Sequence, residues 1–124
     1  MRLKRDSSNQ KKEKFIAEAL LQNMSKMMFK LLFTEKAGSE LDQLEKAKDK
    51  KATLKAVRKT LGWMETNLRH PSLRTHEYSD LKGAHEEKVF ESYAQNRTPG
   101  AYRIFWHYGP QKGQITVVGI VPHP

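Results

Sequence analysis

The sequence predicts an α+β domain in which a helix pair packs on one face of a small, mainly antiparallel four-stranded sheet. Two patterns predict this architecture. Between residues 35 and 69 apolar residues recur at helical spacing, and from residue 88 onward they alternate at the period of a β-strand. A short apolar stretch that ends at Phe33 supplies one further strand. Helices that precede a run of strands are typical of the α+β class.

Capping residues set the bounds of the two expected helices. Thr34 precedes an acidic residue and is typical of a helix N-cap, so the first helix is expected over residues 35–47. The second helix is expected over residues 49–69, with Asp49 as its N-cap and Pro71 just beyond its end. Its apolar stripe consists of Leu54, Val57, Leu61, Met64 and Leu68.

Residues 70–87 contain proline and glycine and are expected to cross irregularly from the second helix to the sheet. Three antiparallel strands follow, KVFESYAQ, AYRIFWHY and QITVVGIV. Pro99 and Gly100 suit the two central positions of a type II turn between the first two strands. The last strand is apolar on both faces, which is typical of a central strand. Its neighbours should be AYRIFWHY and the stretch that ends at Phe33.

Alternation along AYRIFWHY separates two sets of side chains. The bulky set, which we expect to face the helices, consists of Tyr102, Ile104, Trp106 and Tyr108. The other face receives Arg103, Phe105 and His107. A lone arginine on a sheet face is ordinarily exposed, so this pattern leaves Arg103 either a surface charge or part of a site.

The first 26 residues form a basic N-terminal extension, separate from the domain that we expect over residues 27–124. Apolar residues between positions 15 and 20 follow helical spacing, so the extension is expected to be partly helical. Its apolar stretch FIAEALL contains Glu18 and is short for a secretion signal. No run in the sequence approaches the roughly 18 apolar residues of a membrane span. We therefore expect a soluble, cytoplasmic protein.

The chain carries a net charge of +9, and its charges are unevenly placed. Residues 1–60 hold 16 of the 23 Lys and Arg residues and 8 of the 14 Asp and Glu residues, whereas all five histidines lie in the second half. A basic half suits attraction to a polyanion such as nucleic acid, the ribosome or an acidic protein. Groups that titrate near neutrality suit proton-transfer chemistry.

The composition argues against a metal centre or a thiol enzyme. Cysteine is absent, which excludes disulfides, a thiolate nucleophile and cysteine-bound zinc. No pair of histidines has the helical His-x-x-x-His spacing of a zinc site. We therefore expect no metal ion and no other cofactor.

Four stretches together resemble the RelE/ParE superfamily of toxins from bacterial toxin–antitoxin systems. They are MFKLLFTEKAGSELDQL, the loop SDLKG, the strand AYRIFWHYG and the closing ITVVGIVPHP. The order of the elements matches that family: a strand, a helix pair, a loop that ends in a Leu-Lys/Arg-Gly step, and a three-stranded meander. The resemblance covers residues 27–124.

The resemblance implies an activity. RelE-type members cut messenger RNA in the ribosomal A site without a metal ion, whereas ParE-type members poison DNA gyrase and lack the catalytic residues. We expect a ribosome-dependent endoribonuclease whose partners are the ribosome, messenger RNA and a cognate acidic antitoxin. The alternatives are a ParE-like gyrase inhibitor and a non-catalytic RNA-binding relative.

The resemblance also implies roles for single residues. Metal-free RNA cleavage needs a base for the ribose 2′-hydroxyl, a cation for the phosphate and an acid for the leaving oxygen. Arg103 matches the family's sheet arginine and is expected to stabilise the phosphate, and His123 matches the C-terminal catalytic position and is expected to be the acid. His76, with Glu77 as the alternative, lies where some relatives place a base. Lys82, in the LKG step, is expected beside the RNA backbone and completes the expected catalytic set.

Further basic residues are expected to bind RNA by neutralising its phosphates. They are Lys46, Lys48, Lys50, Lys51, Lys55, Arg58, Lys59 and His107. The lysine-rich run among them is also the ordinary pattern of a solvated helix face. The strand KVFESYAQ differs from its counterpart in some ribosome-dependent relatives, which carry several lysines there. This strand has only Lys88, and Glu91 lies inside it. The chain therefore looks more like the relatives that use histidine and a carboxylate.

Overall fold

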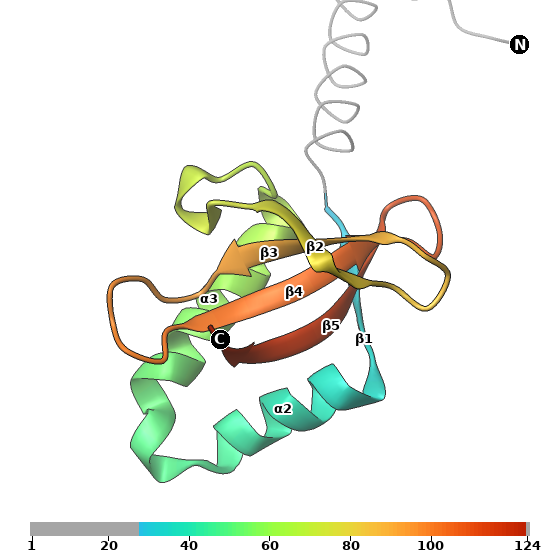
Figure 1. The fold of residues 1–124 in the computed structure, drawn as a ribbon. Coiled ribbons are helices and arrows are strands. Elements are labelled where there is room, and N and C mark those ends of the chain that lie inside the picture. Colours follow the sequence, from blue (N-terminus) through green and yellow to red (C-terminus); the bar gives the residue numbers. More distant parts are fainter. Residues whose placement is uncertain (1–27, 124) are drawn as a thin grey trace, which may run out of the picture.

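The computed structural model describes residues 28–123 (Figure 1), so the expectations for the extension over residues 1–26 lie outside the described part of the chain. The predicted α+β class is confirmed. The elements are β1 (Lys30–Phe33), α2 (Glu35–Lys46), α3 (Lys51–Thr66), β2 (His76–Lys82), β3 (Lys88–Tyr93), β4 (Tyr102–Tyr108) and β5 (Gln114–Pro122), with short 3-10 turns η1 (Lys48–Lys50) and η2 (Pro71–Leu73).

Five strands form one sheet in the order β1-β5-β4-β3-β2. β1 pairs in parallel with β5, and the other neighbours are antiparallel. β5 lies between β1 and β4, as its apolar sequence predicts. In Figure 1, α3 lies behind the sheet and α2 runs alongside β5. No helix within residues 28–123 is long and apolar enough to cross a membrane.

The expectation of an irregular crossing over residues 70–87, and with it the count of four strands, was wrong. Residues His76–Lys82 form β2, which pairs with β3 at the edge of the sheet. Six of its seven residues are exposed, so the strand has no buried face and its sequence shows no apolar alternation. A register shift between Glu77 and Lys82 bends it away from the line of the other strands (Figure 1).

The helix caps were predicted in one case and missed in the other. The hydroxyl of Thr34 accepts the backbone N–H of Ala37 at 3.1 Å, which confirms the predicted N-cap of α2. Asp49 does not cap α3, because it lies inside η1, whereas a capping residue has extended backbone before the helix. The N-cap position is Lys50, and no side chain of the described residues caps this end.

The turn between β3 and β4 has the predicted geometry. The backbone N–H of Ala101 donates to the carbonyl of Thr98 at 3.1 Å. Gly100, at the third position of this turn, has φ of +67°. A type II turn requires positive φ there, which glycine adopts without steric cost.

One apolar core lies between the sheet and the helices, and β4 divides its side chains as predicted. Ile104 and Trp106 are almost fully buried against the apolar stripe of α3, whereas Tyr108, at the strand's end, is half exposed. Arg103 lies on the opposite face, yet its side chain is only 9% exposed. It is therefore not a solvated surface charge, and the groups that surround it define the candidate site.

Candidate active site

A buried carboxylate lies on the sheet face opposite the core. Glu91 is in the middle of β3, directly opposite His76 of β2 and Phe105 of β4. Only 2% of its surface is exposed. Burying a charge is unfavourable unless charged or hydrogen-bonding partners compensate. Three basic side chains from other parts of the chain surround it, and with Glu91 they form what we call the Glu91 cluster: His76, Arg103 and His123.

His76 holds one oxygen of the carboxylate. Its Nε2 lies 2.7 Å from Oε1 of Glu91, and its Nδ1 lies 2.9 Å from the carbonyl oxygen of Arg74. The ring is about half exposed, because β2 is the edge strand. Both ring nitrogens are thus already engaged by groups of the protein.

Arg103 is fixed beside the other oxygen of Glu91. The register of β3 and β4 places it opposite Tyr93, and its guanidinium carbon lies 3.6 Å from the centre of the Tyr93 ring. One terminal nitrogen donates to the carbonyl of Gln95. Its Nε lies 3.7 Å from Oε2 of Glu91. Stacking and the backbone contact hold a cation in a nearly buried position.

The chain end brings His123 to the same place. Its backbone N–H donates to the carbonyl of Ala101 at 2.7 Å, which extends the pairing of β4 and β5 by one step. The side chain is therefore held against the sheet, with Nε2 3.8 Å from Oε2 of Glu91. About half of the ring is exposed, so it can contact both Glu91 and a bound molecule.

Two buried hydrogen-bonding atoms of the cluster have no partner within residues 28–123. Among the described residues, neither Oε2 of Glu91 nor Nε of Arg103 has a hydrogen-bond partner, and their separation of 3.7 Å is too long for a hydrogen bond. Buried polar atoms are nearly always paired. An unpaired acceptor beside an unpaired donor is therefore an unusual arrangement, and it makes the Glu91 cluster the candidate site.

The arrangement can perform acid–base chemistry. A carboxylate oxygen can accept a proton, a guanidinium can stabilise negative charge, and an imidazole can deliver a proton. Within residues 28–123 no group of His, Asp and Glu side chains has the arrangement to hold a metal ion.

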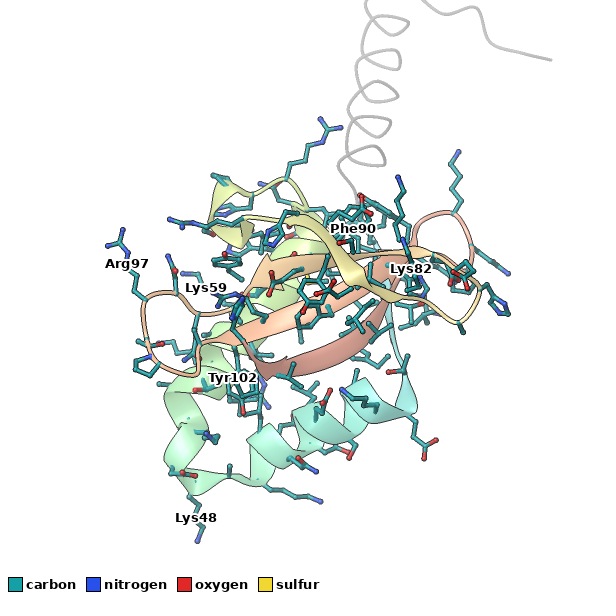
Figure 2. The ribbon with its side chains drawn as sticks, in the orientation of Figure 1. Lys48, Lys59, Lys82, Phe90, Arg97 and Tyr102 are labelled. Carbon is teal, nitrogen blue, oxygen red and sulfur yellow. The ribbon has the colours of Figure 1, made fainter. Side chains whose placement is uncertain are left out.

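Three of the four residues expected to be catalytic, His76, Arg103 and His123, lie in the Glu91 cluster, and Lys82 does not. Lys82 ends β2 opposite Lys88, six residues from His76 and so about 20 Å away along an extended strand. Figure 2 shows Lys82 and Tyr102, the neighbour of Arg103, at opposite ends of the sheet.

Two further sequence candidates also lie outside the cluster. Glu77, the alternative to His76, is opposite Phe90, whose side chain packs against the core, so it lies on the other face of the sheet. His107 shares a face with Arg103 but lies four residues along β4, about 13 Å away. Its Nδ1 is 2.8 Å from the carbonyl oxygen of Tyr108.

The other basic candidates form an exposed group around the turn between the helices, which we call the basic array. Its members are Lys46, Lys48, Lys50, Lys51, Lys55, Arg58 and Lys59. In Figure 2, Lys48 projects from η1, the turn before α3, and Lys59 lies on α3 itself. Arg58 is engaged by Glu45 at 2.8 Å. Lys50 lies over the ring of Tyr102, 5.8 Å from its centre, so the array extends to the strand that carries Arg103.

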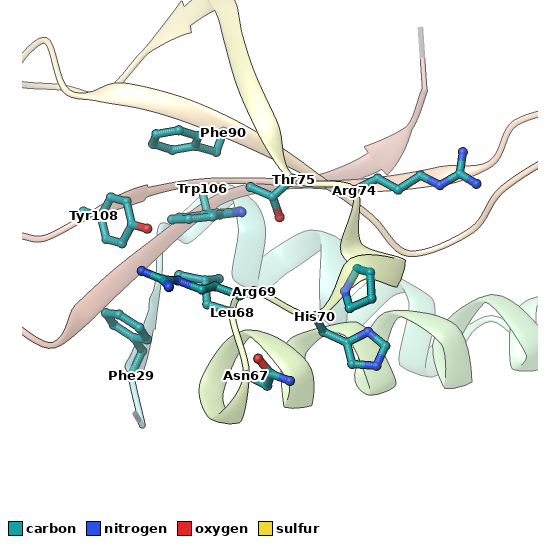
Figure 3. Close-up of a pocket in the computed structure, with 11 residues that line it drawn as sticks. Phe29, Asn67, Leu68, Arg69, His70, Arg74, Thr75, Phe90, Trp106 and Tyr108 are labelled. Carbon is teal, nitrogen blue, oxygen red and sulfur yellow. The ribbon is translucent and has the colours of Figure 1, made fainter. Parts of the chain in front are cut away.

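A pocket of about 790 Å³ lies on the core side of the sheet, and none of the four residues of the Glu91 cluster lines it (Figure 3). Its aromatic walls come from Phe29, Phe90, Trp106 and Tyr108, and its cations from Arg69 and Arg74. No carboxylate is among the described residues that line it, and the ring of His70 is stacked on Trp63. Because the pocket lacks a paired base and acid, the Glu91 cluster is the better candidate for catalysis.

Two solved structures resemble this chain. One is described as a YoeB/ParE toxin from Agrobacterium tumefaciens, with a TM-score of 0.53 and 11% identity over 77% of this chain and 100% of that one. The chain shares the fold of that toxin. The second structure, a YoeB dimer from Staphylococcus aureus, has a TM-score of 0.51 and 12% identity over 78% of this chain and 99% of that one. No family model matches the sequence, and no curated protein matches it.

Within this fold, the central position of Glu91 in the cluster was not predicted from the sequence. The signal was present, because Glu91 is an acid in the middle of a strand whose other central residues are apolar or small. Tyr93 and Gln95, which fix the guanidinium of Arg103, carried no such signal. An aromatic ring in a strand is too common to indicate a site, and Gln95 accepts through its backbone carbonyl, which any residue would provide.

Proposed function

We propose that the chain is the toxin of a toxin–antitoxin system and that it cleaves messenger RNA on the ribosome without a metal ion. The toxin class is supported by the two similar structures, both of which are described as YoeB or YoeB/ParE proteins. The enzymatic part rests on one observation: a guanidinium and an imidazole both lie close to an unpaired carboxylate oxygen, at 3.7 and 3.8 Å. A non-catalytic module has no evident need for this arrangement.

Glu91 is the base in this proposal, in place of His76. Both ring nitrogens of His76 are already engaged, by Arg74 and by Glu91. Oε2 of Glu91 is unpaired among the described residues. The ribose 2′-hydroxyl would donate to this oxygen and lose its proton to it.

The remaining groups complete the reaction. As the 2′-oxygen forms its bond to phosphorus, the bond from phosphorus to the 5′-oxygen breaks, and His123 gives that oxygen a proton from Nε2. Arg103 stabilises the charge on the non-bridging phosphate oxygens, toward which its unpaired Nε can donate. The products are a 2′,3′-cyclic phosphate and a 5′-hydroxyl.

The surface charge suits the proposed partners. The basic array can bind ribosomal RNA phosphates by releasing counterions, without reading sequence. Lys82 and His107 would contact the RNA backbone away from the reacting phosphate. An acidic antitoxin would bind the same basic surface and block it. Ribosome binding would place the protein in the cytoplasm.

The test uses purified protein in a translating extract, with the 5′ ends of messenger RNA mapped before and after addition. A chain that ends at Pro122 lacks His123 but keeps every residue of β5, and should lose cleavage by about 10²–10⁴-fold. His85→Ala, at an exposed position of the β2–β3 turn, is the matched control and should cut as the full chain does.

The gyrase alternative predicts the opposite pattern. If the full chain produces no new 5′ ends, and both the full and the shortened chain inhibit DNA supercoiling, the nuclease proposal fails and a ParE-like activity replaces it.

A further inference from the structure

The hydrogen bonds of His76 require a proton between its ring and Glu91. The carbonyl oxygen of Arg74 can only accept, so Nδ1 of His76, 2.9 Å away, carries a hydrogen. Nε2 lies 2.7 Å from Oε1 of Glu91. A neutral ring with hydrogen on Nδ1 would point the lone pair of Nε2 at a carboxylate oxygen, which is repulsive at this distance. The pair therefore holds one proton more than a neutral histidine and an ionised glutamate would.

The proton belongs on the ring. Imidazole ordinarily binds a proton more tightly than a carboxylate does, and about half of the His76 side chain is in water. The pair is then an imidazolium hydrogen-bonded to a carboxylate, a charge-assisted contact of ordinary length. A buried glutamate without such a partner favours its neutral form.

We propose that His76 is a positioning residue whose imidazolium keeps Glu91 ionised and hydrogen-bonds Oε1, which leaves Oε2 as the oxygen that accepts the proton. This role rests on the proposed function, in which Glu91 is the base. A protonated Glu91 could not accept the 2′-hydroxyl proton. His76 thus acts on the reaction through Glu91 and does not contact the reacting atoms.

No other group that faces Glu91 makes this contact within the described residues. Arg103 and His123 lie beyond hydrogen-bond distance, at 3.7 and 3.8 Å from the carboxylate. Lys36 of α2 reaches the same sheet face beside Gly119 but is paired with Glu40 at 2.7 Å. The charged and titratable groups around the pair are Arg103 from β4, His123 after β5, Tyr93 from β3, and Arg74 before β2.

The direct test is the nitrogen-15 spectrum of histidine-labelled protein at neutral pH. In the wild-type chain both ring nitrogens of His76 should have the shifts of protonated imidazolium. His85, exposed in the β2–β3 turn and not in contact with Glu91, is the internal control. A neutral His76 ring in this spectrum overturns the proposal. The spectrum is recorded without RNA. A result that contradicts the role of His76 can therefore be distinguished from a failure of the protein to cleave RNA.

Two variants extend the test. In Glu91→Gln the His76 ring should become neutral at the same pH, while His85 is unchanged. In His76→Gln, which keeps a hydrogen-bond donor without the charge, cleavage relative to wild type should fall about 10²-fold at neutral pH and recover at alkaline pH, because higher pH favours the ionised form of a buried carboxylate that lacks a cationic partner. An equal loss at every pH would assign His76 a purely structural role and overturn the proposal.

Discussion

At the scale of single residues, two neighbours on β3 differ in how completely they are hydrogen-bonded. Ser92, on the core face, accepts from Nε1 of Trp106 at 2.8 Å and is bonded to the Thr75 hydroxyl at 2.7 Å. Glu91, on the opposite face, keeps Oε2 unpaired among the described residues. A complete buried network stabilises one structure, whereas the network at Glu91 is incomplete.

Replacing Ser92 should therefore reduce stability. In Ser92→Ala the indole N–H of Trp106, which is 1% exposed, loses its acceptor, and the free energy of unfolding should fall by about 1–3 kcal/mol. Urea denaturation measures this, and Ser79→Ala at an exposed position of β2 is the control. Equal midpoints for the two variants would contradict the role assigned to this network.

Glu87 adds a pH-dependent contribution at the β2–β3 turn. The backbone N–H of Glu87 itself and then that of His85 lower the pKa of its carboxyl group. This pKa is lower in the folded chain than in the unfolded one. The ionised carboxylate therefore stabilises the fold at every pH above the ordinary glutamate pKa, and this stabilisation is lost as the pH falls through the lowered pKa. Urea midpoints of wild type and Glu87→Gln should therefore differ most near neutral pH and converge in acid; a constant difference would refute this assignment.

At the scale of elements, a side chain of α2 pairs with the part of β5 that β1 does not reach. β1 pairs with β5 only over Gln114–Val117. Beyond that point the carboxylate of Glu40 accepts the backbone N–H of Ile120 at 3.0 Å and pairs with Lys36 through its other oxygen. The second half of β5, which leads to His123, is held at this edge by a side chain and not by a strand.

Removing this side chain should loosen the end of β5. Glu40→Ala should increase the rate of amide hydrogen exchange at Ile120 but not at Ile115, and should reduce the free energy of unfolding by about 1–3 kcal/mol. Asp42→Ala, at an exposed position of the same helix, is the control. An unchanged exchange rate at Ile120 would contradict the proposal that Glu40 holds this end of β5.

The elements that could be predicted are those with a buried face. The apolar stripe of α3 and the two-sided apolar sequence of β5 follow directly from burial, and the N-cap Thr34 follows from local hydrogen bonding. β2 could not be predicted, because pairing with β3 and not burial holds it in place. The predicted N-cap Asp49 was wrong because residues 48–50, which precede α3, form the 3-10 turn η1.

At the scale of the whole molecule, the Glu91 cluster joins side chains from β2, β3, β4 and the chain end. A resemblance could supply Arg103, His123 and His76, since each matches a position in a known order of elements. It could not supply the central place of Glu91, which depends on the register of β3 against both of its neighbours. Nor could it show that Lys82 lies apart from the cluster, because that distance follows from the extended course of β2.

The uneven charge of the molecule predicts a salt-dependent contact with the ribosome. Replacing Lys50, Lys51 and Lys55 of the basic array by glutamine should weaken binding to ribosomes and reduce the slope of log affinity against log salt by about 2–3. Cleavage at saturating protein should change little. Lys112→Gln, in the exposed turn before β5, is the single-site control. A triple variant with wild-type salt dependence would show that the array is an ordinary solvated helix face.

The chemistry assigned to the Glu91 cluster is tested by the fragments that the protein releases from translated messenger RNA. The wild-type chain should leave a 2′,3′-cyclic phosphate and a 5′-hydroxyl at each cut. Glu91→Gln should slow release by about 10²–10⁴-fold, whereas Glu65→Gln, on the exposed side of α3, should not. Fragments with 5′-phosphate ends, or a Glu91→Gln chain that cuts at the wild-type rate, would contradict catalysis by this cluster.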